Sequence, residues 1–213
     1  MLKGLKSSMY FNGPCFITDK KHVSISVYDV VFNILTSGIK FIQYREKEKP
    51  RRRIYEEAIE LRRLTRDFNA VLIINDHADI ALAVDADGVH LGQEDLPLNA
   101  ARKIMGGKII GISTHNLEQA KAAAAGGADY IGFGPIFHTT TKDAGKPVGI
   151  DGLRLAKKNV NIPVVAIGGI NLDNIEAVLS AGADSVAVAS AICRGDLIKN
   201  AERFMRFLGR QQG

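Results

Sequence analysis

The chain of 213 residues is 46% hydrophobic and 24% charged, proportions that are typical of a soluble globular domain and exclude a disordered, collagen-like or coiled-coil protein. No apolar stretch approaches the roughly 18 residues of a membrane span, and lysines and serines interrupt the first twelve residues before a signal-peptide core could form, so we expect a cytoplasmic protein with no membrane partner. The formal net charge of +5 favours an anionic ligand. Because tryptophan is absent and only 7% of residues are aromatic, we expect a solvated helix face or a small phosphorylated ligand rather than a nucleic acid.

Short apolar runs alternate with helical patterns along the whole chain. Eight strands are predicted, at residues 15–19, 40–45, 71–75, 88–91, 109–113, 130–134, 164–168 and 185–189. A helix is predicted after each strand, at residues 27–36, 52–68, 78–84, 98–105, 117–125, 152–158, 172–180 and 197–208. Eight unbroken βα units favour an α/β fold with a single closed (β/α)8 barrel, a TIM barrel, over an open doubly wound sheet. No linker composition divides the chain, so we expect one domain over residues 1–213, with residues 1–12 as an N-terminal extension.

The two cysteines, Cys15 and Cys193, are too few for a disulfide framework, and without other ligands they cannot form a zinc site. Cys15 begins the first predicted strand, whereas Cys193 lies beyond the end of the eighth. In a closed parallel barrel these strands are neighbours, so about five residues at roughly 3.3 Å each separate the cysteines by about 16 Å. A disulfide needs Cα atoms within roughly 7 Å, and we therefore expect two free thiols.

The second predicted strand has one entirely polar face. Gln43, Arg45 and Lys47 alternate with Ile42 and Tyr44, and side chains along a strand point to opposite faces in turn. Active sites of (β/α)8 barrels form at the C-terminal ends of the strands, where an inward-facing Arg45 could hold a phosphate with two hydrogen bonds. The alternative is a face that points outward and pairs with acids on the covering helix.

Acidic residues follow the third and fourth predicted strands. Asn75 and Asp76 come directly after an apolar run, and Asp95 follows the next strand along the chain. Magnesium typically takes one or two carboxylates and leaves its other positions to water and substrate phosphate oxygens, so Asp76 and Asp95 could hold one Mg2+ ion. The alternative is helix capping, by Asn75 or Asp76 for the helix at 78–84 and by Asp95 near Pro97 for the next helix.

The longest predicted loop follows the sixth strand. It contains three hydroxyl side chains and a cation, which can donate hydrogen bonds to an anion: Thr139, Thr140, Thr141 and Lys142. The alternative is a solvated loop without a role. The seventh strand ends in Gly168 and Gly169, and Ala189 and Ser190 follow the eighth; (β/α)8 barrels frequently bind phosphate at these two loops, where small residues let backbone N–H groups approach.

The five histidines show no spacing typical of a metal site, so we expect no zinc. His90 lies within the fourth strand, where a structural, hydrogen-bonded histidine is expected. His138, on the loop after the sixth strand, is the one candidate for a chemical role.

The motifs together resemble the thiamine-phosphate synthase family, whose members are (β/α)8 barrels. The resemblance extends over nearly the whole chain. It rests on Gln-Tyr-Arg-Glu-Lys at 43–47, Ile-Asn-Asp at 74–76, Val-His-Leu-Gly-Gln-Glu-Asp at 89–95, Gly-Ile-Ser at 111–113, Gly-Pro-Ile-Phe at 134–137, Thr-Thr-Thr-Lys at 139–142 and Ile-Gly-Gly-Ile at 167–170. Their order and spacing are more specific than any single motif.

This resemblance implies a transferase that joins hydroxymethylpyrimidine diphosphate to a thiazole phosphate carboxylate, giving thiamine monophosphate, pyrophosphate and CO2. It implies a dissociative mechanism, in which the diphosphate leaves before the thiazole nitrogen captures the pyrimidine carbocation. It implies a Mg2+ ion at Asp76 and Asp95, with charge on the leaving diphosphate stabilised by Arg45, Lys47 and Lys142. By matching positions, the pyrimidine diphosphate would contact Gln43, Tyr44, Arg45, Glu46, Lys47, Asn75, Ser113 and Lys142, and the thiazole phosphate Thr139, Thr140, Thr141, Gly169, Ala189 and Ser190.

Two departures from the family pattern keep alternatives open. His138 stands where a proline is common, and Ala189 where a larger aliphatic residue is common. A related thiazole tautomerase uses a histidine near this region, but directly after the glycine that matches Gly134, where this chain has Pro135. A non-catalytic barrel that binds a thiamine-related phosphate is the other alternative. Whether the chain assembles into a homo-oligomer is left open.

Overall fold

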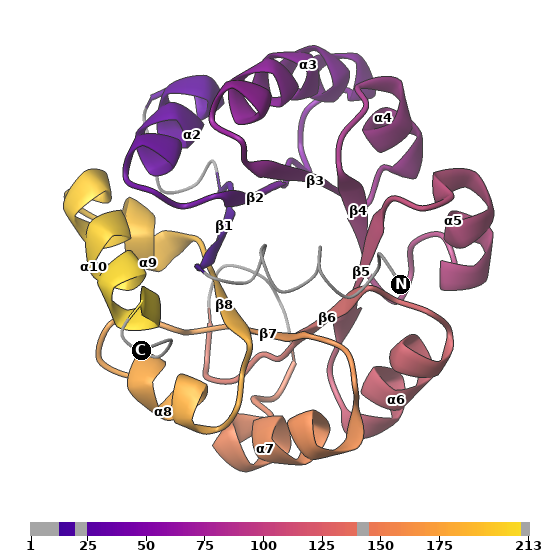
Figure 1. The fold of residues 1–213 in the computed structure, drawn as a ribbon, viewed down its shortest axis with the longest axis vertical. Coiled ribbons are helices and arrows are strands. Elements are labelled where there is room, and N and C mark those ends of the chain that lie inside the picture. The colour runs from indigo at the N-terminus through magenta and orange to yellow at the C-terminus, as the bar shows by residue number, and fades with distance from the viewer. Residues whose placement is uncertain (1–12, 20–24, 140–144, 210–213) are drawn as a thin grey trace.

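Eight parallel strands form a closed barrel in the structure, a computed structural model that describes residues 13–19, 25–139 and 145–209. The strands follow one another around the barrel in sequence order, and β1 pairs with both β2 and β8, which closes it (Figure 1). Their bounds are β1 (Cys15–Ile17), β2 (Phe41–Tyr44), β3 (Val71–Asn75), β4 (Gly88–Leu91), β5 (Ile109–Thr114), β6 (Tyr130–Phe133), β7 (Val164–Ile167) and β8 (Ser185–Val188). The predicted single (β/α)8 barrel is confirmed.

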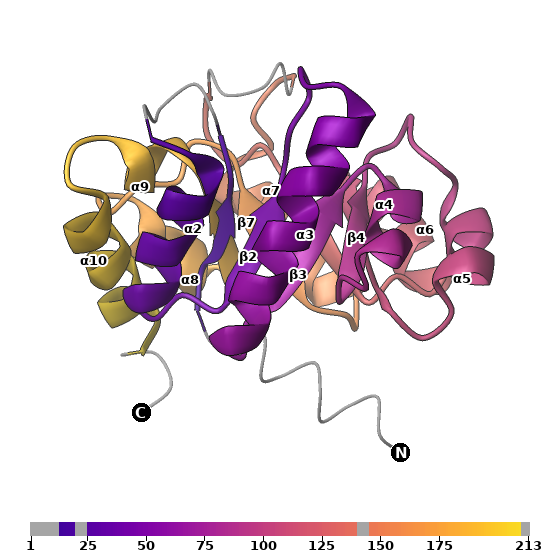
Figure 2. The ribbon, with the colours of Figure 1, turned by 90° about the horizontal axis from the view of Figure 1, so that it is seen from above.

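Helices surround the barrel on the outside (Figures 1 and 2). Their bounds are α2 (Val27–Thr36), α3 (Arg51–Asp67), α4 (Ala78–Ala83), α5 (Leu98–Met105), α6 (Leu117–Ala125), α7 (Gly149–Asn159), α8 (Ile175–Ser180), α9 (Ser190–Cys193) and α10 (Leu197–Gly209). Within the described ranges, none of these helices is both long and apolar enough to cross a membrane.

Three features of the helices differ from the prediction. Helix α7 begins at Gly149 rather than at residue 152. Helix α8 begins at Ile175 rather than at residue 172, because the Ile175 N–H and the Asn174 N–H both donate to the Asn171 carbonyl and make residues 171–174 a turn. Helix α9 was not predicted, since one turn of helix is too short to show a periodic pattern. It lies next to α10 at the β8 side of the barrel (Figure 1).

Apolar side chains form two cores, one on each side of the barrel wall. The larger core lies between the strands and the helices. From α3 it includes Ile54, Ala58, Leu61 and Leu64, which recur at the helical spacing of three or four residues. The smaller core fills the barrel interior and includes Tyr130. Alternating residues of each strand therefore serve the two cores.

The interior contains a hydrogen-bonded polar group below the end of β5. The two ring nitrogens of His90 lie 2.9 Å from the Tyr130 hydroxyl and 2.8 Å from Ser113 Oγ. A Cβ atom on Gly111 would lie 2.1 Å from Tyr130 Cζ, and one on Gly132 would lie 3.1 Å from His90 Cε1, so glycines make room for both rings. The prediction that His90 is a hydrogen-bonded structural residue is confirmed.

The cysteines are both buried and unpaired, as predicted. Cys15 lies opposite Ala187, the third residue of β8, and not opposite the first residue as the predicted separation assumed, because the strands of a barrel are staggered. Burial raises the pKa of the Cys193 thiol to about 12, with a further contribution from the Asp19 carboxylate. Burial also raises the pKa of the Cys15 thiol.

We expect the native protein to react slowly with a thiol reagent and quickly after unfolding, because both thiols are buried and neutral. The pKa values of both thiols are raised in the folded state, so the folded chain keeps these protons at a pH where the unfolded chain has lost them. Stability should therefore fall as the pH rises above about 8.5, the ordinary value for cysteine. Denaturation at several pH values and mass spectrometry of the native protein test this; an intramolecular disulfide would contradict it.

Candidate active site

A cavity of about 550 Å³ lies at the C-terminal mouth of the barrel, the end at which all eight strands finish. Its walls come from the loops after β1, β2, β5, β6, β7 and β8. Six of the predicted substrate-binding residues line it: Arg45, Ser113, Thr139, Gly169, Ala189 and Ser190. Thr140, Thr141 and Lys142 lie outside the described residues. The fold thus brings together side chains from five separate parts of the sequence.

The polar face of the second strand points inward, and the outward alternative is wrong. Gln43 is buried in the barrel, where its Nε2 donates to Asn75 Oδ1 at 2.8 Å. Arg45 lines the cavity. Lys47 lies farther along the same loop, with its Nζ 2.5 Å from Asp76 Oδ2. One loop therefore presents two cations, one to the cavity and one to the acidic residue after β3.

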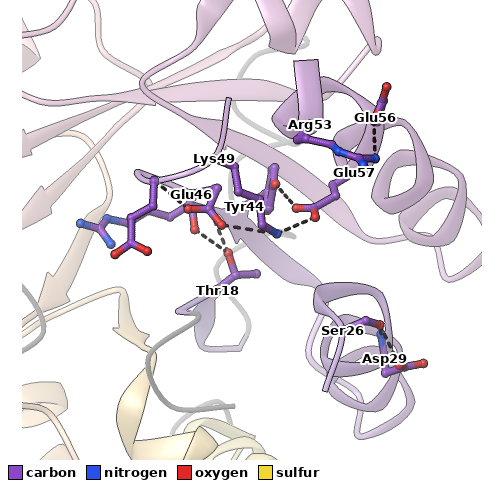
Figure 3. A network of polar contacts seen from close by, with 11 residues as sticks. Thr18, Ser26, Asp29, Tyr44, Glu46, Lys49, Arg53, Glu56 and Glu57 are labelled. Carbon is purple, nitrogen blue, oxygen red and sulfur yellow. Dashed lines mark hydrogen bonds and ion pairs between the residues drawn. The ribbon is translucent and has the colours of Figure 1, made fainter. Parts of the chain in front are cut away.

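Tyr44 and Glu46 lie on the other face, toward α3 (Figure 3). The Tyr44 hydroxyl donates to Glu57 Oε2 at 2.5 Å, and the Lys49 ammonium lies 2.5 Å from Glu57 Oε1 and 3.5 Å from Glu46 Oε2. These contacts turn both side chains away from the cavity. Tyr44 and Glu46 therefore support the loop after β2 instead of facing the cavity, where contact with the diphosphate was predicted.

Asp76 and Asp95 are neighbours at the ends of β3 and β4. Burial raises the pKa of Asp95; the Gly92 N–H, which donates to its Oδ2 at 2.6 Å, opposes this, and a hydrogen bond with the Asp76 carboxyl raises the pKa further. Asp76 has a φ of +64°, a left-handed conformation that aspartate tolerates better than most residues. The capping alternative is wrong, because His77 and Pro97 occupy the cap positions of α4 and α5, and in the part of the chain that the structure describes neither helix has a side-chain cap.

The two carboxylates fit a magnesium ion by their chemistry. Hard divalent cations take carboxylate oxygens, and Mg2+ commonly keeps several positions for water and substrate phosphate. Among the described residues, no three His, Cys, Asp or Glu side chains gather into a metal site. An ion at Asp76 and Asp95 would therefore take most of its ligands from water or substrate.

The opposite side of the cavity is built from small residues. Gly168 and Gly169 follow β7 with φ values of +98° and +66°, and a Cβ atom on Gly169 would lie 2.5 Å from the His138 carbonyl oxygen. Asn174 Nδ2 donates to the Gly169 carbonyl at 3.0 Å and holds this turn. Ala189 and Ser190 lie at the start of α9 and line the same part of the cavity. Because its side chains are small, this wall leaves room for a ligand group that accepts hydrogen bonds from backbone N–H groups.

Several polar residues of the cavity were not predicted from the sequence, among them Thr18, Asp19 and Arg194. Thr18 and Asp19 follow β1 directly and line the cavity, as does Arg194 after α9. Polar residues at the end of an apolar strand were the available signal for Thr18 and Asp19, the same signal that identified Asp76. His138 is exposed and also lines the cavity.

The comparison with protein families decides the assignment. The family described as thiamine monophosphate synthase matches residues 14–192. This chain belongs to that family. It is 52% identical over 180 residues to a thiamine-phosphate synthase of Chloroflexus aurantiacus, which covers 84% of this chain and 83% of that protein. It is 46% identical over 200 residues to the thiamine-phosphate synthase of Moorella thermoacetica, covering 92% and 95% of the two chains.

A solved structure supports the same family. The thiamine phosphate pyrophosphorylase from Pyrococcus furiosus superposes with a TM-score of 0.89 at 40% identity, covering 96% of this chain and 98% of that one. The predicted family and the predicted activity of a transferase, thiamine-phosphate synthase, are confirmed. The thiazole tautomerase and the non-catalytic barrel are not favoured, because the relatives carry the name of the synthase.

Proposed function

We propose that this chain binds both phosphorylated substrates in the cavity at the C-terminal mouth. The pyrimidine diphosphate would lie on the β2–β3–β4 side and the thiazole phosphate on the β7–β8 side. The observation that carries this assignment is the loop after β2. It presents Arg45 to the cavity and Lys47 to Asp76, so one segment joins the cavity to the paired carboxylates. A diphosphate that bridges these two cations would have its leaving group beside the acidic pair.

The residues on the diphosphate side would place positive charge beside the leaving diphosphate. Arg45 can donate two parallel hydrogen bonds to a phosphate, and Lys47 adds a compact positive charge. Ser113, held at the end of β5 by the 2.8 Å contact with His90, offers a hydroxyl at the cavity wall. Lys142 would add a further cation from the loop after β6. Hydrogen-bond donors directed at the charge that develops in the transition state usually make the largest single contribution to catalysis.

Asp76 and Asp95 would hold the Mg2+ ion. When bound, the ion supplies positive charge to the diphosphate oxygens. The protein's own contribution is to keep two carboxylates adjacent, which it does by the turn at Asp76 and by the bond from the Gly92 N–H to Asp95. The Lys47 ammonium, 2.5 Å from Asp76 Oδ2, places a positive charge beside this carboxylate.

The thiazole phosphate side would bind through small residues and hydroxyls. Gly169, Ala189 and Ser190 form one wall, where backbone N–H groups can reach phosphate oxygens, and Thr139 lines the same cavity. Thr140 and Thr141 would extend this set of donors. With the two phosphates bound at opposite walls, the thiazole nitrogen and the pyrimidine methylene would meet between them.

A turnover assay with both substrates and Mg2+ tests the proposal. Thiamine monophosphate and pyrophosphate should form together, and Arg45→Gln should lower kcat/KM by roughly a hundredfold because a charged donor to the leaving group is lost. The matched control is Arg52→Gln on α3, since the Arg52 side chain is 88% exposed and pairs only with Glu56 among the described residues. A change in the thiazole substrate alone would indicate a tautomerase, and no reaction would indicate a binding protein. Equal activity of both variants would remove Arg45 from the site.

A further inference from the structure

The loop after β2, residues 45–49, is held from two sides, by hydrogen bonds from Thr18 and by an ion pair with Glu57. We propose that Thr18 and Glu57 are positioning residues, which hold this loop so that Arg45 and Lys47 are already in place before the diphosphate binds. The inference rests on the proposed function of the loop. Thr18 and Glu57 then contribute to the affinity for the diphosphate through the position of this loop.

Thr18 holds the first residue of the loop. Its backbone N–H donates to the Gln43 carbonyl at 3.0 Å, which is the last rung between β1 and β2. Beyond that rung, Thr18 Oγ1 accepts the Arg45 N–H at 2.8 Å and donates to the Arg45 carbonyl at 3.1 Å. The Thr18 side chain is buried, so water does not readily replace it. A single hydroxyl thus satisfies both backbone polar groups of Arg45 where the sheet ends.

Glu57 holds the far end of the loop from α3. One carboxylate oxygen accepts the Tyr44 hydroxyl at 2.5 Å, and the other lies 2.5 Å from the Lys49 ammonium (Figure 3). Lys49 also approaches Glu46, whose Oε1 accepts the Glu48 N–H at 2.8 Å. These contacts tie residues at both ends of the loop to one glutamate of the first helical turns. Lys47, between them, is left to reach Asp76.

The contacts of Thr18 and Glu57 should strengthen binding, because they order the loop before the diphosphate arrives. A loop that is free in the unliganded protein must lose conformational entropy when it closes on a ligand, and the loss appears as weaker binding. Small displacements of a charged donor also reduce its effect on the reacting group. Loss of the contacts made by Thr18 or Glu57 should therefore weaken binding of the diphosphate more than binding of the thiazole phosphate, which is proposed to bind at the other wall.

The test compares four variants with the wild-type enzyme. Thr18→Val keeps the shape of the side chain and removes both bonds to Arg45; Thr18→Ser keeps the hydroxyl. Glu57→Gln keeps an acceptor for the Tyr44 hydroxyl and removes the negative charge that faces Lys49. The Glu57 side chain is partly exposed. The control is Glu60→Gln, an exposed residue of the same helix. Melting curves verify that each variant is folded.

We expect Thr18→Val and Glu57→Gln to raise KM for the pyrimidine diphosphate by about tenfold or more, with a much smaller change in KM for the thiazole phosphate. Calorimetry with pyrophosphate and Mg2+ should show the same loss of affinity. Thr18→Ser should restore most of it, and Glu60→Gln should match the wild type. Equal losses for both substrates, or unchanged KM in folded Thr18→Val and Glu57→Gln, would overturn the inference. A wild-type enzyme that forms no product would instead overturn the proposed function, and this inference with it.

Discussion

Asp76→Asn should lower kcat by roughly a hundredfold or more at saturating substrates, and it should raise the Mg2+ concentration needed for half-maximal activity. Asparagine is the informative replacement because Asp76 has a φ of +64°, and asparagine, like aspartate, tolerates this left-handed conformation. The variant therefore removes a carboxylate charge with little backbone strain. Steady-state kinetics over a Mg2+ titration measures both effects.

The control for this experiment is Asp79→Asn. Asp79 lies three residues farther along, on α4, where its side chain is 64% exposed and pairs with Arg51. It shares the charge and the neighbourhood of Asp76 but does not face Asp95. Its activity and Mg2+ dependence should equal those of the wild type. If Asp76→Asn has normal rates and still requires Mg2+, the ion is bound elsewhere and the acidic pair has another role.

Gly111→Ala should destabilise the barrel by about 3 kcal/mol, the upper part of the range for overpacked cores. The added Cβ atom would lie 2.1 Å from Tyr130 Cζ, so the tyrosine ring has to move. Its movement is restricted, because Tyr130 is buried, lies edge-to-face against Phe41 with ring centroids 5.7 Å apart, and contacts His90 through its hydroxyl. Displacement of His90 should also disturb Ser113 at the cavity wall.

Denaturation with urea measures this loss of stability, and the KM for the pyrimidine diphosphate should rise in the same variant. Gly107→Ala is the matched control, since no atom of the described residues lies within 4 Å of a Cβ atom added there. Its unfolding midpoint should stay near that of the wild type. Similar midpoints for the two alanine variants would show that the barrel interior adapts to the extra methyl group at little cost.

Local patterns in the chain were sufficient to predict the barrel and much of its mouth. Apolar runs bounded by turn residues predicted eight strands in the correct order, because a buried strand needs such a run whatever its neighbours are. The alternation of Gln43, Arg45 and Lys47 predicted a shared face, since side chains along an extended chain alternate in direction. The proximity of Asp76 and Asp95 followed from their places after adjacent parallel strands.

Contacts between distant segments depended on the tertiary structure. Periodicity shows which face a side chain occupies but not which partner it meets, so the bonds from Tyr44 to Glu57, from Thr18 to Arg45 and from His90 to Tyr130 and Ser113 were not predictable from the chain alone. The stagger of β1 against β8 and the single turn of α9 also could not be predicted from the chain alone. The physical reason is that these features arise only when the barrel closes, because closure sets the strand register and the space that each side chain can fill.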